Sequence, residues 1–216
     1  MKWQLLAEVP DEALRALLTI ARRRTFSRNE VVFHGGDPAD SLHLIRTGRF
    51  AVRIVTPVGD AAMLAVRGPG DAFGELALLG GESVRSATVA ALEAGETHSV
   101  YRDDFQRLRR EFPRVNDVLI GILSDHLRRL SEQMIEAYYV PAERRVLRRV
   151  RELAELYGRS SEEVVVPLTQ EEIAELAGTS RATVNRVLRE AERRGSIELR
   201  RGKTAVVDLD ALSRRC

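Results

Sequence analysis

Apolar residues change their spacing along the chain, and each spacing predicts a different kind of element. In residues 1–22 they recur close to helical intervals, at Leu5, Leu6, Val9, Leu14, Leu17, Leu18 and Ile20. Pro10 and Asp11 suit the start of a helix. From about residue 23 to residue 101 the apolar residues form short runs separated by glycine and proline turns, namely EVVFH, SLHLIRT, RFAVRIVT, AAMLAVR, VRSATVAAL and ETHSVYR. Short strands at even spacing predict an antiparallel barrel or jelly roll.

Helical spacing returns between residues 102 and 138. Phe112 and Pro113 mark a helix start, and apolar side chains then follow at steps of three or four, at Leu119, Leu123, Leu127, Leu130, Met134 and Ala137. Such a helix of about 26 residues is roughly 39 Å long at 1.5 Å per residue. A barrel of about 80 residues cannot cover that whole stripe, and the stripe has the spacing of a coiled-coil seam. We therefore expect a homodimer, with a helix packed only on its own barrel as the alternative.

Val140-Pro141 interrupts the long helix, because proline lacks a backbone donor and disfavours helical geometry in the residue before it. We expect a domain boundary and a hinge at this point. Beyond it, ERRVLRRVRELAELYG is helical, SSEEVVVPL contains a short strand, and two further helices follow. The last segment, SIELRRGKTAVVDL, reads as a β-hairpin that turns at Arg201-Gly202.

The segment LTQEEIAELAGTSRATVNRVLREAERRG is typical of a helix-turn-helix. Thr169 is expected to cap the first helix, with Glu172 at capping-box spacing, while Gly178 makes the turn and Ser180 caps the second helix. The predicted buried positions are Ile173, Ala174 and Ala177 in the first helix and Val184, Val187, Leu188 and Ala191 in the second. Arg181, Asn185, Arg186 and Arg189 then point outward. Between Ser180 and Arg194 the chain carries five arginines against two glutamates, which suits a groove lined with phosphates.

The positions of the polar residues in this segment predict which of them contact DNA bases and which contact the DNA phosphates. Arg181 and Arg186 stand early in the second helix, where a guanidinium can donate two hydrogen bonds to guanine. The predicted DNA contacts also include polar residues for phosphates and the basic residues of the hairpin, so that the full set is Thr169, Gln170, Ser180, Arg181, Thr183, Asn185, Arg186, Arg201 and Lys203. The alternative is a helical hairpin without a binding role, whose arginines are exposed to solvent.

A second motif, GPGDAFGELALLGGESVRSATVAAL, predicts a cradle for an anion inside the barrel. A buried cyclic nucleotide needs a fixed cation and backbone donors for its phosphate, a carboxylate for its ribose hydroxyl, and glycine for close approach. Gly74, Glu75 and Leu76 offer the glycine, the carboxylate and a short helix start, and Arg85 and Ser86 offer the cation and a hydroxyl. The alternative is a surface ion pair between Glu75 and Arg85.

The distribution of charge supports different roles for the N-terminal and C-terminal parts of the chain. The chain carries 34 Lys and Arg against 32 Asp and Glu, a net charge of +2. Residues 140–216 hold 16 of the basic and 13 of the acidic residues, so the C-terminal part is positive and the remainder is close to neutral. This mild asymmetry favours nucleic acid as the partner of the C-terminal part.

Composition argues against several other classes. No run approaches the roughly 18 apolar residues of a membrane span, and the acid-containing N-terminus lacks a signal-peptide cleavage site. The single cysteine, Cys216, provides neither an internal disulfide nor cluster ligands, so a reducing cytoplasm is expected. His34, His43, His98 and His126 are scattered and are interpreted as surface residues, not as metal ligands. No catalytic set of side chains is apparent, so we expect neither an enzyme nor a metal site.

With these motifs in this order, the whole chain resembles the cyclic-AMP receptor protein/FNR superfamily of bacterial regulators. The resemblance rests on FGELALLGGESVRSATV, on LRRLSEQM in the long helix, and on TQEEIAELAGTSRATVNRVL followed by RRGKTAVV. It implies a homodimer whose effector repositions the DNA-binding domains on a two-fold symmetric operator. It also implies that Gly74 and Glu75 lie at the ribose, Arg85 and Ser86 at the phosphate, and that Arg181 and Arg186 read bases.

Two positions depart from the receptor's pattern. Gln133-Met134 stand where the receptor presents a Thr-Ser pair to adenine from its long helix; glutamine can bond a purine, but methionine cannot replace a hydroxyl. Ala182 stands where the receptor's recognition helix has a glutamate, so a carboxylate acceptor for cytosine is replaced by a methyl group. The half-site is therefore expected to differ from the receptor's.

The sequence thus predicts an α+β protein in three parts. Residues 1–112 form an antiparallel β jelly-roll that binds cyclic nucleotides, residues 113–139 a long dimerisation helix, and residues 140–216 a winged helix-turn-helix domain. The expected protein is a cytoplasmic transcription regulator controlled by cAMP or another cyclic nucleotide, with double-stranded DNA, a second copy of itself and RNA polymerase as candidate partners. A constitutive or differently liganded regulator with a degenerate pocket is the alternative.

Overall fold

The computed structural model describes residues 10–55, 61–79, 84–158 and 163–215. Contacts divide the chain into two compact units. The main division falls between Ser131 and Glu132, inside the long helix, and the short segment that ends at Met63 is grouped with the second unit. Two predicted features lie outside the described residues: the beginning of the first predicted helix, with Leu5, Leu6 and Val9, and the GGES segment of the anion motif.

The first unit is built on two four-stranded sheets. One sheet has the order β1-β8-β3-β6, with bounds Arg22–Phe26, Gly95–Tyr101, Ser41–Thr47 and Ala72–Phe73. The other has the order β2-β7-β4-β5, with bounds Val31–Phe33, Thr88–Ala91, Phe50–Val55 and Ala61–Arg67. The paired strands with a described register run antiparallel. The predicted jelly-roll type of architecture is confirmed.

Strands β1 and β6 were not predicted. In β1 only Phe26 is buried, while the side chains of Arg22 to Thr25 are exposed, so the alternation that marks a half-buried strand is missing. The strand exists because its backbone pairs with β8, from Arg22 opposite Ser99 to Phe26 opposite Gly95. Strand β6 has only two residues and is held by pairing with β3.

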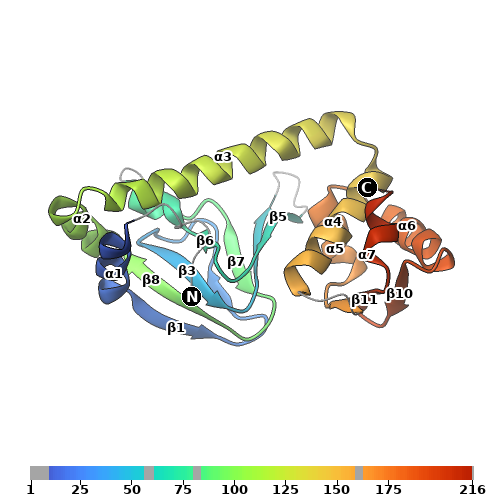
Figure 1. Ribbon diagram of the computed structural model, residues 1–216, viewed down its shortest axis with the longest axis horizontal. Coiled ribbons are helices and arrows are strands. Elements are labelled where there is room, and N and C mark those ends of the chain that lie inside the picture. Colours follow the sequence, from blue (N-terminus) through green and yellow to red (C-terminus); the bar gives the residue numbers. More distant parts are fainter. Residues whose placement is uncertain (1–9, 56–60, 80–83, 159–162, 216) are drawn as a thin grey trace. The chain divides into compact units, whose positions relative to one another are not determined.

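Two apolar clusters hold this unit together. The smaller one is aromatic and includes Phe26, Phe50 and Phe73, with the Phe50 and Phe73 ring centroids 5.3 Å apart. The larger one joins β3 and β8 to helices α1 (Asp11–Ile20), α2 (Arg102–Glu111) and the start of α3 (Val115–Tyr139). Figure 1 shows α1 and α2 together near one end of β8. Because Val115, Leu119 and Ile122 belong to this cluster, α3 begins anchored on the barrel.

Helix α3 is continuous over 25 residues, as the apolar spacing predicted. At the N-terminal end of α3, the exposed apolar stripe is displaced by one residue from the predicted positions. Leu119 is buried in the barrel core, at 6% exposed, so its place in the outward stripe was wrong; Ile120 is 59% exposed and takes that place. Leu127, Leu130 and Met134 continue the exposed stripe. The helix therefore carries two apolar faces, one used within the chain and one exposed.

The second unit contains the remaining elements. Its helices are α4 (Ala142–Tyr157), α5 (Gln170–Ala177), α6 (Arg181–Arg193) and α7 (Leu209–Ser213), and its sheet has the order β10-β11-β9, with bounds Ile197–Arg200, Lys203–Val206 and Val164–Val166. The break at Pro141 is confirmed, because α3 ends at Tyr139 and α4 begins at Ala142. Figure 1 shows the four helices gathered with the β10–β11 hairpin. Helix α7, which was not predicted, is capped by Asp208.

Candidate functional site

The caps of the helix-turn-helix form as the sequence predicts. The Thr169 hydroxyl accepts from the backbone N–H of Glu172 at 3.2 Å, and Glu172 accepts in return from the backbone N–H of Thr169 at 2.8 Å. Gly178 ends α5 in the left-handed conformation with φ of 59°, which glycine adopts without a steric penalty. The Ser180 hydroxyl then accepts from the N–H of Thr183 at 3.2 Å and starts α6. These local bonds set the angle between the two helices.

Both helices bury the predicted faces. The buried side chains are Ile173, Ala174 and Ala177 in α5 and Val184, Val187, Leu188 and Ala191 in α6. Arg181, Asn185, Arg186 and Arg189 are exposed. Helix α6 therefore presents a polar, mainly basic face, which is what a helix that enters the major groove requires.

All four of these side chains already have partners within the chain, and Arg189 donates to Glu192 at 3.1 Å. Arg186 donates to Oε1 of Glu143 in the first turn of α4 at 2.7 Å. Arg181 lies 3.9 Å from Glu171, and the Asn185 amide donates to Gln170 at 3.0 Å. The bond from Arg186 is the leading cause that lowers the pKa of Glu143, so this carboxylate stays ionised. When Arg186 binds a DNA base, an acceptor atom of that base must take the place of the Glu143 carboxylate.

The predicted phosphate contacts differ in availability. The hydroxyl of Thr169 donates to Glu172 at 3.0 Å, so this proton is committed to the cap, while the Ser180 and Thr183 hydroxyls lie 3.1 Å apart. The β10–β11 hairpin is the wing of this domain. Arg201 and Lys203 are exposed at its turn, where Arg200 pairs with Lys203 in register. Gly202 supports this tight turn with φ of 71°.

Arg145 joins the start of α4 to the end of α5. Its Nε donates to the carbonyl of Ala177 at 3.0 Å, and its terminal nitrogens donate to the carbonyls of Val140 and Gly178 at 3.0 and 2.9 Å. Val140 is the last residue before Pro141, and Gly178 is the turn residue of the helix-turn-helix. One guanidinium thus links the α3–α4 junction to that turn. No periodic pattern of residues predicts this contact.

In the first unit, the anion motif brings Gly74 and Arg85 together. Gly74 has φ of 79°, and a Cβ atom added there would lie 2.8 Å from Nη1 of Arg85 and 2.9 Å from the carbonyl oxygen of Ser41. A side chain at residue 74 would therefore fill the space that the guanidinium uses. Glu75 follows at the start of η2 (Glu75–Leu78), a single 3-10 turn of four residues. The predicted helix start is thus too short to add much dipole, and the cation carries most of the attraction for an anion.

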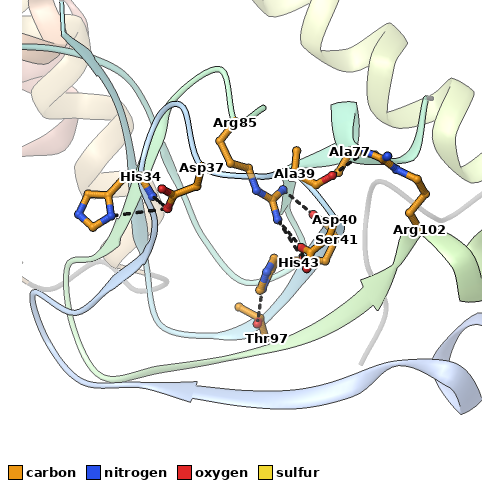
Figure 2. A network of polar contacts seen from close by, with 10 residues as sticks. All are labelled: His34, Asp37, Ala39, Asp40, Ser41, His43, Ala77, Arg85, Thr97 and Arg102. Carbon is orange, nitrogen blue, oxygen red and sulfur yellow. Dashed lines mark hydrogen bonds and ion pairs between the residues drawn. The ribbon is translucent and has the colours of Figure 1, made fainter. Parts of the chain in front are cut away.

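Arg85 is buried, at 6% exposed, and makes three hydrogen bonds around β3. Nη1 donates to the Ser41 carbonyl at 2.6 Å, and Nη2 donates to the Ser41 hydroxyl at 3.0 Å and to Asp40 at 3.1 Å. The guanidinium carbon also lies 3.9 Å above the centre of the Phe33 ring. Figure 2 shows the guanidinium directed at Asp40 and Ser41, with His43 and Thr97 beyond them. Burial lowers the pKa of Arg85, and the charges of Asp40 and Asp37 oppose that change.

His43 lies behind Arg85 and was wrongly assigned to the surface. Its ring stacks on Phe73 with centroids 5.0 Å apart, and Nδ1 lies 3.0 Å from the Thr97 hydroxyl. Burial, reinforced by the charges of Arg85 and Arg24, lowers the pKa of His43 to about 3. The imidazole is therefore neutral and serves as part of the aromatic core.

Glu75 is 9% exposed and has a partner that the sequence reasoning missed. Nδ1 of His126, on α3, lies 3.2 Å from its Oε1. Burial alone would raise the pKa of Glu75, but the bond and charge of His126, a backbone bond and the charge of Arg67 outweigh it and lower the pKa. The surface ion pair between Glu75 and Arg85 is thus not the arrangement seen, because each residue is buried and bound to another partner. Helical phase could have revealed His126, four residues after the buried Ile122.

The other predicted effector contacts are placed differently. Leu76 is 48% exposed, and Ser86 is exposed next to the buried Arg85. Gln133 and Met134 lie in the part of α3 that belongs to the second unit, where Met134 is 57% exposed. The described residues therefore bring Gly74, Glu75 and Arg85 close together in one cradle, and the effector-binding roles of all seven residues stay predictions.

The cradle fits a compact anion with a hydroxyl-bearing group. Nε of Arg85 is buried and has no hydrogen-bond partner among the described residues, which leaves one charged donor unsatisfied. A Cβ at residue 74 would lie 2.8 Å from Nη1 of the same guanidinium, so glycine is what allows the backbone and the cation to approach this closely. Among the described residues, no group of three or more His, Cys, Asp or Glu side chains could hold a metal ion. No helix in the described ranges is long and apolar enough to span a bilayer.

Comparison with known proteins agrees with these two sites. Residues 23–112 match the cyclic nucleotide-binding domain family, and residues 144–215 match the Crp-like helix-turn-helix domain family. The first match contains the Gly74–Arg85 cradle, and the second contains α5, α6 and the wing.

Relatives of similar length share both domains. A CRP-like cAMP-activated global transcriptional regulator from Mycobacterium tuberculosis is 30% identical over 96% of this chain and 93% of its own. The cyclic AMP receptor protein of Thermus thermophilus is 32% identical over 91% of this chain and 88% of its own. The c-di-GMP-responsive regulator CLP of Xanthomonas campestris shares the fold, with a TM-score of 0.76 and 21% identity over 92% of this chain and 99% of its own. The chain therefore belongs to the cyclic-AMP receptor protein/FNR family, whose members are transcription regulators and not enzymes.

Proposed function

We propose that this regulator is a homodimer whose binding to a two-fold symmetric operator is controlled by a cyclic nucleotide, with cAMP as the first candidate. The observation that carries the effector part is the buried Arg85 with an unsatisfied Nε beside the positive-φ Gly74. The cAMP assignment draws on the names of the Mycobacterium tuberculosis and Thermus thermophilus relatives.

In this proposal each part of the nucleotide meets a different group. Arg85 and Ser86 hold the phosphate, and Glu75 accepts the ribose hydroxyl beside Gly74. Leu76 flanks the sugar, and Gln133 and Met134 on α3 meet the base. Methionine offers the base an apolar contact in place of a hydroxyl, so a preference between adenine and guanine rests on Gln133.

The dimer part rests on the exposed stripe of α3. Ile120, Leu127 and Met134 are exposed and repeat every seven residues, and the exposed Leu130 stands three residues after Leu127. Leu123, three residues after Ile120, is partly buried against the barrel core. This is the a/d pattern of a two-stranded coiled coil, and its natural occupant is the same stripe of a second copy. Two copies then present two α6 helices to successive major grooves, which requires a symmetric operator. A location in the cytoplasm, with RNA polymerase as a candidate partner, follows from that role.

Calorimetric titration of the full chain with cAMP and cGMP tests the effector part. We expect binding by the wild type and a loss of at least about tenfold for Arg85→Lys, because lysine cannot form the planar, forked set of bonds. Arg46→Lys, which alters the ion pair between the exposed Arg46 and the buried Glu96, is the matched control. No heat with either nucleotide at near-millimolar concentration would contradict the effector part.

Operator binding tests the DNA part. Arg181→Ala and Arg186→Ala are each expected to weaken binding by about 1–3 kcal/mol, the range for a base-contacting arginine. Arg193→Ala, at the far end of the same helix, is expected to change affinity little at equal salt. Equal losses for all three variants would show that α6 contributes charge without reading bases.

One observation favours a second candidate function. The terminal nitrogens of Arg85 already bond Asp40 and Ser41, so the cradle is partly satisfied without a ligand. This fits a regulator that binds DNA without a nucleotide or responds to another ligand. Full operator affinity of the nucleotide-free protein, unchanged by cAMP or cGMP, would favour this second candidate.

A further inference from the structure

The outward face of α6 is less positive than its sequence suggests, because carboxylates from other helices lie beside its arginines. Nη2 of Arg186 lies 2.7 Å from Oε1 of Glu143, in the first turn of α4. Arg181 lies 3.9 Å from Glu171, in the first turn of α5. Of these two pairs, the first is within hydrogen-bond distance and the second is not. Arg186 is therefore the base-reading candidate that the chain itself holds more tightly.

The segments that carry Glu143 and Arg186 are fixed beside each other. Arg145 donates to the carbonyls of Ala177 and Gly178, which joins the first turn of α4 to the turn that precedes α6. The bond from Arg186, followed by a bond from its own backbone N–H, lowers the pKa of Glu143, so the side chain of Glu143 is held and charged. Because both partners are brought together by the packing of the unit, the pair loses less conformational entropy on forming.

Glu143 and a DNA base are alternative acceptors for the same guanidinium. Nη2 of Arg186 donates to the carboxylate in the free protein, so this donor is available to a base only after the bond to Glu143 is broken. A guanine offers O6 and N7 in its place, and both are uncharged acceptors. The released carboxylate must then be hydrated close to DNA phosphates of the same charge. Each base contact of Arg186 therefore carries a free-energy cost that Glu143 imposes.

We propose that Glu143 is an internal competitor of DNA for Arg186 and lowers the affinity of the protein for its operator. This inference rests on the proposed function of Arg186 as a base-reading residue. A neutral amide at residue 143 would leave the guanidinium available and remove the charge that faces the phosphates. Because the bond to Glu143 must be broken for any base, Glu143 changes the affinity and leaves the preferred base the same.

The test is fluorescence-anisotropy titration of the full chain with a symmetric duplex that the wild type has selected from a random-sequence pool, at constant salt and with cAMP present. One exposed ion pair contributes about two- to fivefold, and the duplex meets two α6 helices, so Glu143→Gln is expected to bind about 4- to 25-fold more tightly. Glu155→Gln removes the same charge from α4 and is the matched control. It should change affinity by less than about twofold, since salt screens a charge about 18 Å further along the helix.

A double-mutant cycle separates competition for Arg186 from general repulsion of DNA. Glu143→Gln should leave affinity unchanged in an Arg186→Ala background, because no guanidinium is left to release. An equal gain in both backgrounds would overturn the inference, as would a Glu143→Gln affinity equal to that of the wild type. Glu143→Ala should show the same gain and keeps the test decisive if the glutamine variant does not fold.

Selection from the random pool gives a second readout. Glu143→Gln should return the same preferred sequence as the wild type, and a changed sequence would overturn the inference by showing that residue 143 itself takes part in base reading. An Arg186→Ala variant that keeps the wild-type affinity would instead overturn the proposed base-reading function of Arg186, and this inference with it.

Discussion

At the scale of single residues, Gly74 links backbone conformation to the cradle. Gly74→Ala is expected to destabilise the protein and to lower nucleotide affinity, because its Cβ would lie within 3 Å of Arg85 and of the Ser41 carbonyl. Gly36→Ala is the matched control, since Gly36 also has a positive φ but has no atom within 4 Å of the added Cβ. Backbone strain alone costs about 1–2 kcal/mol. Urea unfolding and nucleotide titration of both variants would separate the steric clash of the new Cβ from the strain of the backbone. Equal losses of stability and of affinity in the two variants would show that the clash does not contribute.

His43 predicts how the fold responds to acid. Its pKa is lowered from 6.5 to about 3, so below pH 6.5 the unfolded chain binds a proton that the folded chain does not. Stability is therefore retained above pH 6.5 and lost as pH falls toward 3, by at most about 1.4 kcal/mol per pH unit from this group. Urea unfolding at pH 7, 6 and 5 measures the slope, and His43→Gln should reduce it. An unchanged slope in that variant would exclude His43 as the cause.

The sequence predicted part of the cradle at this scale. Gly74, Glu75 and Arg85 are predictable because a bound nucleotide needs a glycine for close approach, a carboxylate for its ribose and a cation for its phosphate. The partners Asp40, Ser41 and His126 were not predicted, since they come from distant segments whose positions depend on strand pairing and on the phase of α3. Histidine in particular has no spacing that separates a surface position from a site.

At the scale of elements, helices were predicted better than strands. The buried faces of α5 and α6 matched residue for residue, because capping and a 3.6-residue period are local properties of the sequence. Strand β1 was missed because its stability lies in pairing with β8 and not in its own pattern. The one-residue error between Leu119 and Ile120 has a similar origin, since only contact with the barrel decides which side of α3 faces inward.

Arg145 gives a prediction about the coupling between elements. Arg145→Lys removes the forked set of bonds to Val140, Ala177 and Gly178 and is expected to cost about 1–3 kcal/mol of stability. Operator affinity should fall as well, because the turn before α6 loses its support. Arg144→Lys, on an exposed neighbouring residue, is the control for thermal unfolding and DNA binding. Stability equal to that of the control would show that the three carbonyls find other donors.

At the scale of the whole molecule, the exposed stripe of α3 predicts the oligomeric state. A Leu127→Glu, Leu130→Glu double variant is expected to be a monomer by sedimentation equilibrium, since it places charges in the proposed seam. Its affinity for a symmetric operator should fall by about 10²- to 10⁴-fold, the usual gain from two linked sites. Glu132→Lys alters the charge of the same helix by an equal amount outside the stripe and should stay dimeric. A dimeric double variant would place the interface elsewhere.

The two faces of α3 also constrain how this protein can change over time. His126 and Leu127 are neighbours in sequence, yet one faces the barrel and the other faces outward. Deleting a single residue upstream of them would turn the rest of the helix by about 100° and exchange these roles. Removal or insertion of seven residues, close to two full turns, would preserve both faces. We therefore expect natural variation in this helix to replace residues freely while leaving its length almost untouched.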